Sequence, residues 1–214
     1  MKYEYIMWDW NGTLINDVDV NFEILNKLLS SRNLPEFDSV DKYRNMFGFP
    51  IIDFYEKAGF DLVKERYEDI AREYSHLYDD FFPTVELYEN SEDVLRFFFN
   101  EGISQLIVSA SQQRLLTHQV MLHGIDHYFD DILGMSDIYG KGKVSVARHW
   151  MASEGVMGRN VLFIGDTVHD KEVADSIGCD CVLVANGHNS KELLLSTGAV
   201  VVESIEQVKE WVKG

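Results

Sequence analysis

Ile6-Met-Trp-Asp9-Trp-Asn11-Gly12-Thr13-Leu14 is the stretch from which we first predict the fold. Asp9 directly follows a short apolar run, and open α/β sheets bind their ligands at the carboxyl ends of such strands. Gly12 lets the chain turn close to a ligand, and Thr13 can fix that turn by hydrogen bonding. A carboxylate held there can attack phosphorus. An ordinary Asx turn explains the same residues when the stretch is considered alone.

Other short apolar runs predict the rest of a parallel sheet. Runs of this length, rich in Val and Ile and without polar alternation, are typical of strands that are covered on both faces. From about residue 91 onward they alternate with amphipathic segments that end at glycine, a common helix stop. Ser91 is the expected N-terminal cap of the first of these segments. The pattern indicates a doubly wound α/β core. The predicted strands span residues 5–8, 105–108, 161–164, 181–184 and 200–202, with 132–134 as a weaker candidate.

The interval from about residue 17 to residue 82 indicates one helix after another, most clearly over 21–31 and 61–78. Strand-like runs lie before and after this interval. We therefore predict an α/β core of residues 1–15 and 86–214, with residues 16–85 inserted into it as an all-helical cap domain. Two such lobes leave a cleft between them, and clefts between lobes commonly bind ligands.

A second stretch, Val161-Leu-Phe-Ile-Gly165-Asp166-Thr-Val-His-Asp170, again places an aspartate at the end of an apolar run. Asp170 follows four residues later, at the start of the next predicted helix. A tight loop can bring both carboxylates around one point, which hard cations with oxygen ligands require. Asp170 also suits the positive end of a helix dipole, but that explanation does not account for Asp166.

Two weaker signals supply groups that suit a phosphate. Ser109 ends the run Leu106-Ile-Val-Ser109-Ala-Ser111, and hydroxyl and N–H groups at a strand–helix junction can bind phosphate oxygens. Serine is also a common helix cap. Lys143 opens a predicted helix in Gly140-Lys-Gly-Lys143, where its charge opposes the helix dipole. A functional charge therefore competes there with an ordinary surface lysine.

Composition and charge argue against several partners. The 214 residues include 36 acidic and 19 basic ones, a formal net charge of −17, which repels nucleic acid and anionic membranes. No run approaches the roughly 20 apolar residues of a membrane span, and the first residues lack a secretory signal. We expect a cytoplasmic protein, either monomer or homodimer. Cys179 and Cys181 are too few for a structural zinc site and are best interpreted as buried core thiols.

In this order the segments resemble the four short motifs of the haloacid dehalogenase superfamily, and the resemblance spans the whole chain. The helical block resembles the cap of phosphoglycolate phosphatase-like and β-phosphoglucomutase-like members. The resemblance implies a Mg²⁺-dependent phosphatase that hydrolyses a small phosphorylated metabolite through an aspartyl-phosphate. Lys141 is an alternative to Lys143 for the third motif. Position by position, the resemblance implies Mg²⁺ ligands at Asp9, the Asn11 carbonyl, Asp166 and Asp170, phosphate or substrate contacts from Gly12, Thr13, Ser109, Ala110 and Lys143, and catalytic roles for Asp9, Asn11, Ser109 and Lys143.

The sequence departs from the family pattern at Asn11. Family phosphatases usually carry a second aspartate there, which protonates the leaving group and then activates water, and an amide can do neither. Three explanations follow: another acid such as a water or His76, an engineered change, or a protein that binds phosphorylated ligands without turnover. A dehalogenase needs no metal, so the Asp166 and Asp170 pair counts against it. A phosphomutase needs acid–base help in both transfers, so Asn11 weakens that alternative further.

Overall fold

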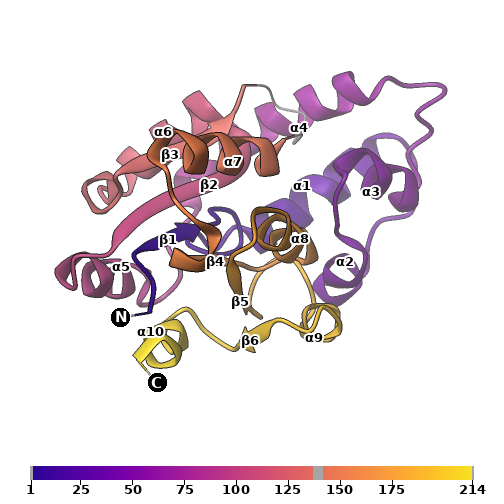
Figure 1. The fold of residues 1–214 in the computed structure, drawn as a ribbon. Coiled ribbons are helices and arrows are strands. Elements are labelled where there is room, and N and C mark those ends of the chain that lie inside the picture. The colour runs from indigo at the N-terminus through magenta and orange to yellow at the C-terminus, as the bar shows by residue number, and fades with distance from the viewer. Residues whose placement is uncertain (1, 137–141, 214) are drawn as a thin grey trace.

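The apolar runs predicted from the sequence pair into one parallel sheet (Figure 1). The computed structural model describes residues 2–136 and 142–213. Within them the strand order is β3-β2-β1-β4-β5-β6, so the first strand of the chain is central. The expected doubly wound α/β core is therefore confirmed. Its strands are β1 (Tyr5–Trp8), β2 (Ser104–Gln112), β3 (Asp131–Met135), β4 (Val161–Gly165), β5 (Asp180–Val184) and β6 (Val200–Val202).

The central strand β1 sends successive side chains into two hydrophobic cores. Ile6 and Trp8 join one core and Met7 the other, and all three are buried. Because side chains alternate across a strand, helices cover both faces of the sheet. The first core includes α5 (Ser91–Asn100), α6 (Gln113–Leu122) and α10 (Glu206–Lys213), and the second includes α7 (Lys143–Glu154), α8 (Val168–Ile177) and α9 (Lys191–Ser196). Single turns of 3₁₀ helix occur at Phe82–Thr84, Asp126–Tyr128 and Gly158–Asn160.

A block of helices separates β1 from α5 along the chain. It contains α1 (Val18–Ser31), α2 (Val40–Met46), α3 (Ile51–Ala58) and α4 (Tyr67–Phe81), which gather beside one end of the sheet (Figure 1, right). The chain leaves and returns through paired segments, since Asn16 N–H donates to Glu86 O at 2.9 Å and Tyr88 N–H donates to Leu14 O at 3.0 Å. We call residues 16–85 the helical insert. Its status as a separate cap domain stays a prediction, and the paired segments lie at the expected boundaries.

Two local predictions need correction. We expected β2 to end near Val108, but it continues to Gln112 through a bulge. Val108 pairs with Leu133 and Gln112 with Met135, so an advance of four residues along β2 matches an advance of two along β3. We expected Ser91 to cap α5, but Ser91 is the first helical residue. Its hydroxyl donates to Leu14 O at 3.2 Å, and Asn90 precedes the helix with φ 65°.

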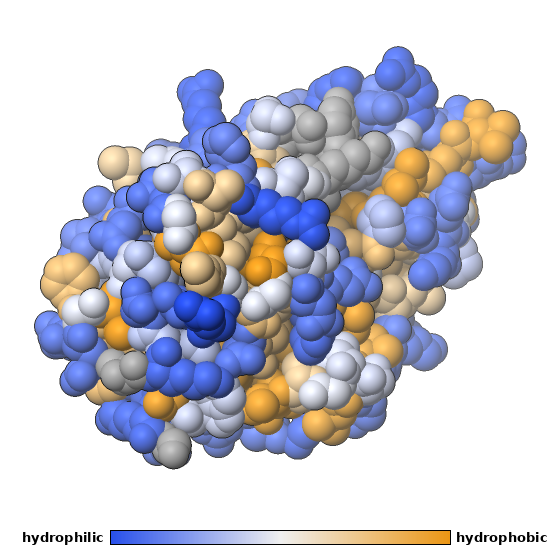
Figure 2. Space-filling model, in the orientation of Figure 1, coloured by the Kyte–Doolittle hydropathy of each residue, from blue (hydrophilic) through white to orange (hydrophobic). Residues whose placement is uncertain are grey.

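The face of the molecule drawn in Figure 2 is mostly hydrophilic, as the net charge suggests. Apolar residues show at the protruding end of the insert, over the connection between α3 and α4, where Val63 is 97% exposed. Across residues 2–136 and 142–213, no helix has both the length and the apolar character needed to cross a membrane. Both cysteines have free thiols; Cys181 is buried and Cys179 is half-buried.

A buried polar pair joins β1 to β2, and it yields a stability prediction. Trp8 Nε1–H donates to Gln105 Oε1 at 3.1 Å, and the Gln105 amide donates to Leu95 O at 3.0 Å. Gln105→Leu leaves the buried Trp8 indole N–H without its partner, so we expect a loss of about 1–3 kcal/mol in the free energy of urea unfolding. Trp8→Phe should then cost less in the Gln105→Leu background than in the wild type. Equal costs in both backgrounds would show that the hydrogen bond contributes nothing.

Candidate active site

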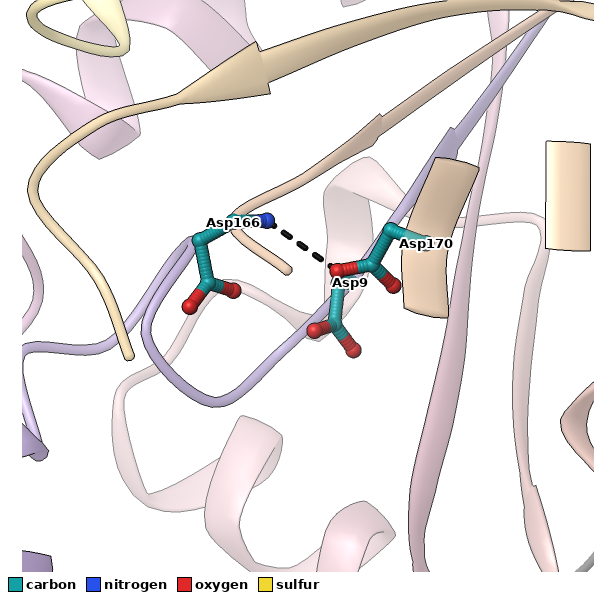
Figure 3. Close-up of side chains that lie close together, drawn as sticks. All are labelled: Asp9, Asp166 and Asp170. Atoms are coloured by element: carbon teal, nitrogen blue, oxygen red, sulfur yellow. Dashed lines mark hydrogen bonds between the residues drawn. The ribbon is translucent and has the colours of Figure 1, made fainter. Parts of the chain in front are cut away.

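Three aspartates meet at the carboxyl edge of the sheet. Asp9 directly follows β1, Asp166 directly follows β4, and Asp170 lies in the first turn of α8. All three are buried, and each offers an oxygen atom within 4.8 Å of those of the other two. Figure 3 shows the three side chains together, with the backbone N–H of Asp166 directed at Asp170. The two neighbouring strand ends therefore bring together the carboxylates that the sequence singled out.

Residues of the loop between β4 and α8 hold the Asp170 side chain by hydrogen bonds to one carboxylate oxygen, Oδ2. Asp170 Oδ2 accepts from Asp166 N–H at 3.1 Å, from Thr167 N–H at 2.9 Å and from the Thr167 hydroxyl at 2.7 Å. Thr167 in turn accepts from Asp170 N–H at 3.2 Å, which completes a capping box. Asp170 therefore helps Thr167 to cap α8 and still presents its other oxygen to Lys143 in the site.

Lys143 is the first residue of α7 and lies buried between two of the aspartates. Its Nζ is 2.7 Å from Asp9 Oδ1 and 2.6 Å from Asp170 Oδ1. Burial alone lowers the pKa of Lys143, but Asp170 and Asp9 outweigh it and hold the pKa above its usual value. The ammonium group is therefore charged and not a solvated surface group. Lys141, the alternative for this position, lies outside the described residues.

The charges of these four groups do not balance. Three carboxylates and one ammonium group leave two negative charges in a buried space. Burial, followed by the neighbouring Asp170, raises the pKa of Asp9 well above its usual value, and burial raises the pKa of Asp166 to about 6. A bound divalent cation would relieve this repulsion, and carboxylate oxygens are the ligands that hard cations prefer. The donor set therefore fits a divalent metal ion.

The loop after β1 supports Asp166. Thr13 Oγ1 donates to Asp166 Oδ1 at 2.7 Å, and His188 N–H donates to Asp166 Oδ2 at 2.6 Å. Gly12 has φ +73°, and a Cβ there would lie 2.4 Å from Asp166 Oδ2 and 2.5 Å from His188 Cδ2. Gly12 and Thr13 contact Asp166 and are not among the residues that line the cavity described next. Their predicted contact with phosphate stays a prediction.

A cavity of about 190 Å³ opens between the sheet edge and the helical insert. Asp9, Ser109, Ala110 and Lys143 line it from the core, and α2, α3 and α4 contribute residues from the insert. Ser109 is buried in the bulge of β2, where its hydroxyl oxygen accepts from Ser111 N–H at 3.1 Å. Its hydroxyl hydrogen is then available to a ligand in the cavity.

The side chain of Asn11 is fully engaged beside the aspartates. Its Nδ2 group donates to Asp17 Oδ2 at 2.8 Å and to the Tyr78 hydroxyl at 2.9 Å. Its Oδ1 accepts from the Ser111 hydroxyl at 2.8 Å. Tyr78 also donates to Asp17 Oδ2 at 2.7 Å. Both amide hydrogens and the amide oxygen therefore have partners.

Asp17 and His188 are site residues that the sequence reasoning missed. Asp17 is completely buried, and its Oδ1 accepts from Gly12 N–H at 2.8 Å and faces His188 Nε2 at 3.2 Å. Burial opposes both charges, but each group favours the other's charged form, so the pKa of His188 is raised and that of Asp17 lowered. His188 is buried and lines the cavity. One sequence feature could have identified His188: it is a polar residue that follows shortly after a predicted strand, now β5.

Three basic residues of the insert, His76, Arg44 and Arg66, are not part of the cavity lining. His76, named as a possible acid, is exposed and is not among the residues that line the cavity. Arg44 donates to the carbonyl oxygens of Gly187 and Asn186, and Arg66 pairs with Glu68 on the surface. These groups therefore give the cavity neither an acid nor a cation.

The close approach at Gly12 generates a prediction with a matched control. Gly102 has nearly the same φ, +72°, but a Cβ there meets nothing within 4 Å. Gly102→Ala should cost about 1–2 kcal/mol, the penalty of a left-handed backbone alone. Gly12→Ala should cost at least about 1 kcal/mol more, because Asp166 and His188 must shift. Urea unfolding of both variants measures the difference, and equal costs would contradict the tight packing around Asp166.

A doubly wound sheet with an acidic site at its carboxyl edge defines an α/β protein whose ligand binds at the strand ends. Residues 6–184 match the family described as haloacid dehalogenase-like hydrolase, and the chain belongs to that family. The superfamily and the hydrolase class expected from the sequence motifs are thereby confirmed.

Relatives of known name match most of the chain. A phosphoglycolate phosphatase from Photobacterium profundum is 24% identical over 219 residues, 98% of this chain and 96% of the relative. The pyrophosphatase PpaX from Halalkalibacterium halodurans is 25% identical over 181 residues, 79% of this chain and 78% of the relative. A haloacid dehalogenase-like family hydrolase from Streptococcus pneumoniae has a solved structure that covers 99% of both chains, with a TM-score of 0.83 and 17% identity. That likeness shows the fold.

Proposed function

We propose that the chain is a Mg²⁺-dependent phosphatase that hydrolyses a small phosphorylated metabolite through an aspartyl-phosphate on Asp9. One observation carries the proposal: three buried carboxylates converge with Lys143, and Asp9 and Lys143 of this group line one cavity together with Ser109. Phosphoryl transfer depends mainly on such positioning and electrostatic stabilisation. The phosphatase names of the relatives from Photobacterium profundum and Halalkalibacterium halodurans support the same reaction class.

Four groups would hold the metal ion. They are the carboxylates of Asp9, Asp166 and Asp170 and the main-chain carbonyl of Asn11, all of them oxygen ligands of the kind that Mg²⁺ prefers. When bound, Mg²⁺ neutralises the carboxylates and the phosphoryl oxygens. It thereby removes the charge repulsion between the nucleophile and its anionic substrate.

The chain's own residues account for the transfer itself. An oxygen of Asp9 bonds to phosphorus while the bond from phosphorus to the ester oxygen breaks, and the electron pair goes to that oxygen. Lys143, already 2.7 Å from Asp9 Oδ1, and Ser109 donate hydrogen bonds to the phosphoryl oxygens. Water then attacks the aspartyl-phosphate and releases phosphate. The helical insert limits the access of bulk water to the cavity.

The network around Asn11 supports an asparagine that is native to this chain. An aspartate at position 11 would bring a carboxylate to the place of Nδ2, 2.8 Å from Asp17 Oδ2. Both amide hydrogens have acceptors there, whereas a carboxylate has none to give. We infer that the surroundings of position 11 are built for an amide. The leaving oxygen then takes its proton from water and not from this side chain.

The first test measures phosphate release from p-nitrophenyl phosphate with Mg²⁺ and after EDTA. We expect turnover with Mg²⁺ and none after chelation, and Asp9→Asn should lose at least about 10³-fold in kcat because the nucleophile is gone. Thermal unfolding shows whether Asp9→Asn is folded. Equal turnover with and without Mg²⁺, or an active Asp9→Asn, would contradict the proposal. Mg²⁺-dependent phosphate binding without turnover would establish the alternative, a protein that only binds phosphorylated ligands.

The second test exchanges the polar groups of Asn11 and Asp17. Asn11→Asp alone should lose about 1–3 kcal/mol of stability, because two carboxylates then face each other. Adding Asp17→Asn restores an amide–carboxylate pair and places the carboxyl group at position 11, so stability should partly recover. The double variant should hydrolyse β-glycerophosphate at least about tenfold faster than the wild type, since its leaving group needs a proton. A folded double variant without that gain would show that position 11 does not face the leaving oxygen.

A further inference from the structure

The part of the cavity that the insert contributes is lined by aromatic rings. Eight aromatic residues line the cavity within the described chain, among them Tyr43 of α2, Phe54 of α3 and Tyr74 of α4. Leu25 and Leu115 add aliphatic surface. A leaving group in this space therefore meets mainly apolar groups.

Several tyrosine hydroxyl groups in this wall are engaged by the protein. Tyr43 pairs with His188 Nδ1 at 2.8 Å, Tyr78 donates to Asp17 Oδ2 at 2.7 Å, and Tyr74 donates to Asn21 Oδ1. These hydroxyls are therefore held by wall residues, so that the tyrosines meet a ligand mainly through their rings. Aromatic faces carry partial negative charge and disfavour an anion.

Within residues 2–136 and 142–213, the cavity has no cation to spare for a second anion on the substrate. Among its described lining residues, Lys143 is the one lysine or arginine, and Asp9 and Asp170 hold its Nζ. His188 also lines the cavity, but Asp17 lies 3.2 Å from its Nε2 and balances any positive charge there. An anionic leaving group would thus lose solvation without gaining a free cationic partner among the described residues, which is unfavourable.

The size of the cavity suits one ring beside a phosphate. Its volume is about 190 Å³. An apolar cavity of roughly 150 Å³ is large enough to bind benzene. An aromatic ring that entered this space would contact the rings of α2, α3 and α4, while its phosphate reached Asp9.

We propose that the substrate is a phosphate monoester of an uncharged aromatic alcohol, an inference that rests on the proposed phosphatase function. The chemistry at Asn11 points independently to the same class. A phenol-type oxygen, with a pKa of about 10, leaves as an anion far more readily than an aliphatic alkoxide. When the bond to phosphorus breaks, such an oxygen keeps the electron pair and takes a proton from water afterwards. The missing carboxylic acid is therefore least harmful for aryl esters.

The test compares phenyl phosphate with 4-carboxyphenyl phosphate, which differ by one carboxylate on the ring. The carboxylate makes the phenol a better leaving group, so chemistry alone would favour the carboxylated ester. We expect kcat/KM for phenyl phosphate to be at least about tenfold higher, because the cavity cannot pair the second charge. Phosphoglycolate also carries a carboxylate, and we expect its kcat/KM to be as low as that of 4-carboxyphenyl phosphate. Equal or better turnover of either carboxylated ester would overturn the inference while leaving the phosphatase function intact.

A matched pair of variants on α6 locates the effect in the cavity. Leu115 lines the cavity, whereas Leu122 of the same helix is 60% exposed and is not among the lining residues. Leu115→Lys should lower the preference for phenyl phosphate by about tenfold by pairing the carboxylate, and Leu122→Lys should leave it unchanged. Thermal unfolding reports whether Leu115→Lys is folded, and the wild-type ratio decides the inference even if it is not. Absence of Mg²⁺-dependent release from every ester would overturn the phosphatase function itself.

Discussion

Three carboxylates and one ammonium group share a buried space at the carboxyl edge of the sheet, and much of the surrounding chain is arranged around them. Burial makes each uncompensated charge costly, so each carboxylate needs donors in fixed positions. Asp166 accepts hydrogen bonds from the Thr13 hydroxyl and the His188 N–H. The backbone segments that carry these donors can come so close only where the neighbouring residues lack a Cβ. A Cβ on Gly187 would lie 2.1 Å from Asp166 Oδ2, closer than the 2.4 Å at Gly12. The position of the Asp166 carboxylate therefore explains why glycine occupies positions 12 and 187.

A second buried carboxylate joins the insert to the core. Asp17 lies just before α1 and accepts hydrogen bonds from Asn11 and Gly12 of the core loop and from Tyr78 of α4. His188, after β5, completes the set. The position of the insert is thus tied to the loop that carries Asp9. Moving α4 away from the sheet would remove a donor from a buried carboxylate, which opposes opening of the cavity.

The sequence was sufficient for the groups fixed by local structure. The carboxyl ends of parallel strands meet at one edge, so apolar runs followed by Asp9 and Asp166 place both residues without knowledge of the tertiary packing. The predicted helix start made Lys143 a candidate, but it did not separate a functional charge from a surface lysine or Lys143 from Lys141. Asp17 and His188 could not be placed, because their meeting depends on how the insert packs against the loop after β5. The bulge of β2 could not be predicted from the sequence either, because it is defined by the pairing of β2 with β3.

The division of charge between core and insert also bears on what the site can select. Every cationic group that lines the cavity in the described chain already faces a buried carboxylate, Lys143 those of the core and His188 that of Asp17, and the cavity lining from the insert is mainly aromatic. The net charge of −17 acts in the same direction over longer distances, since it repels a substrate more strongly with each added negative charge. In the proposed reaction only the phosphate would find compensation, from Lys143 and from the divalent cation that the acidic site fits. The electrostatics of the whole chain and the local chemistry of the cavity thus favour a ligand whose charge is confined to its phosphate.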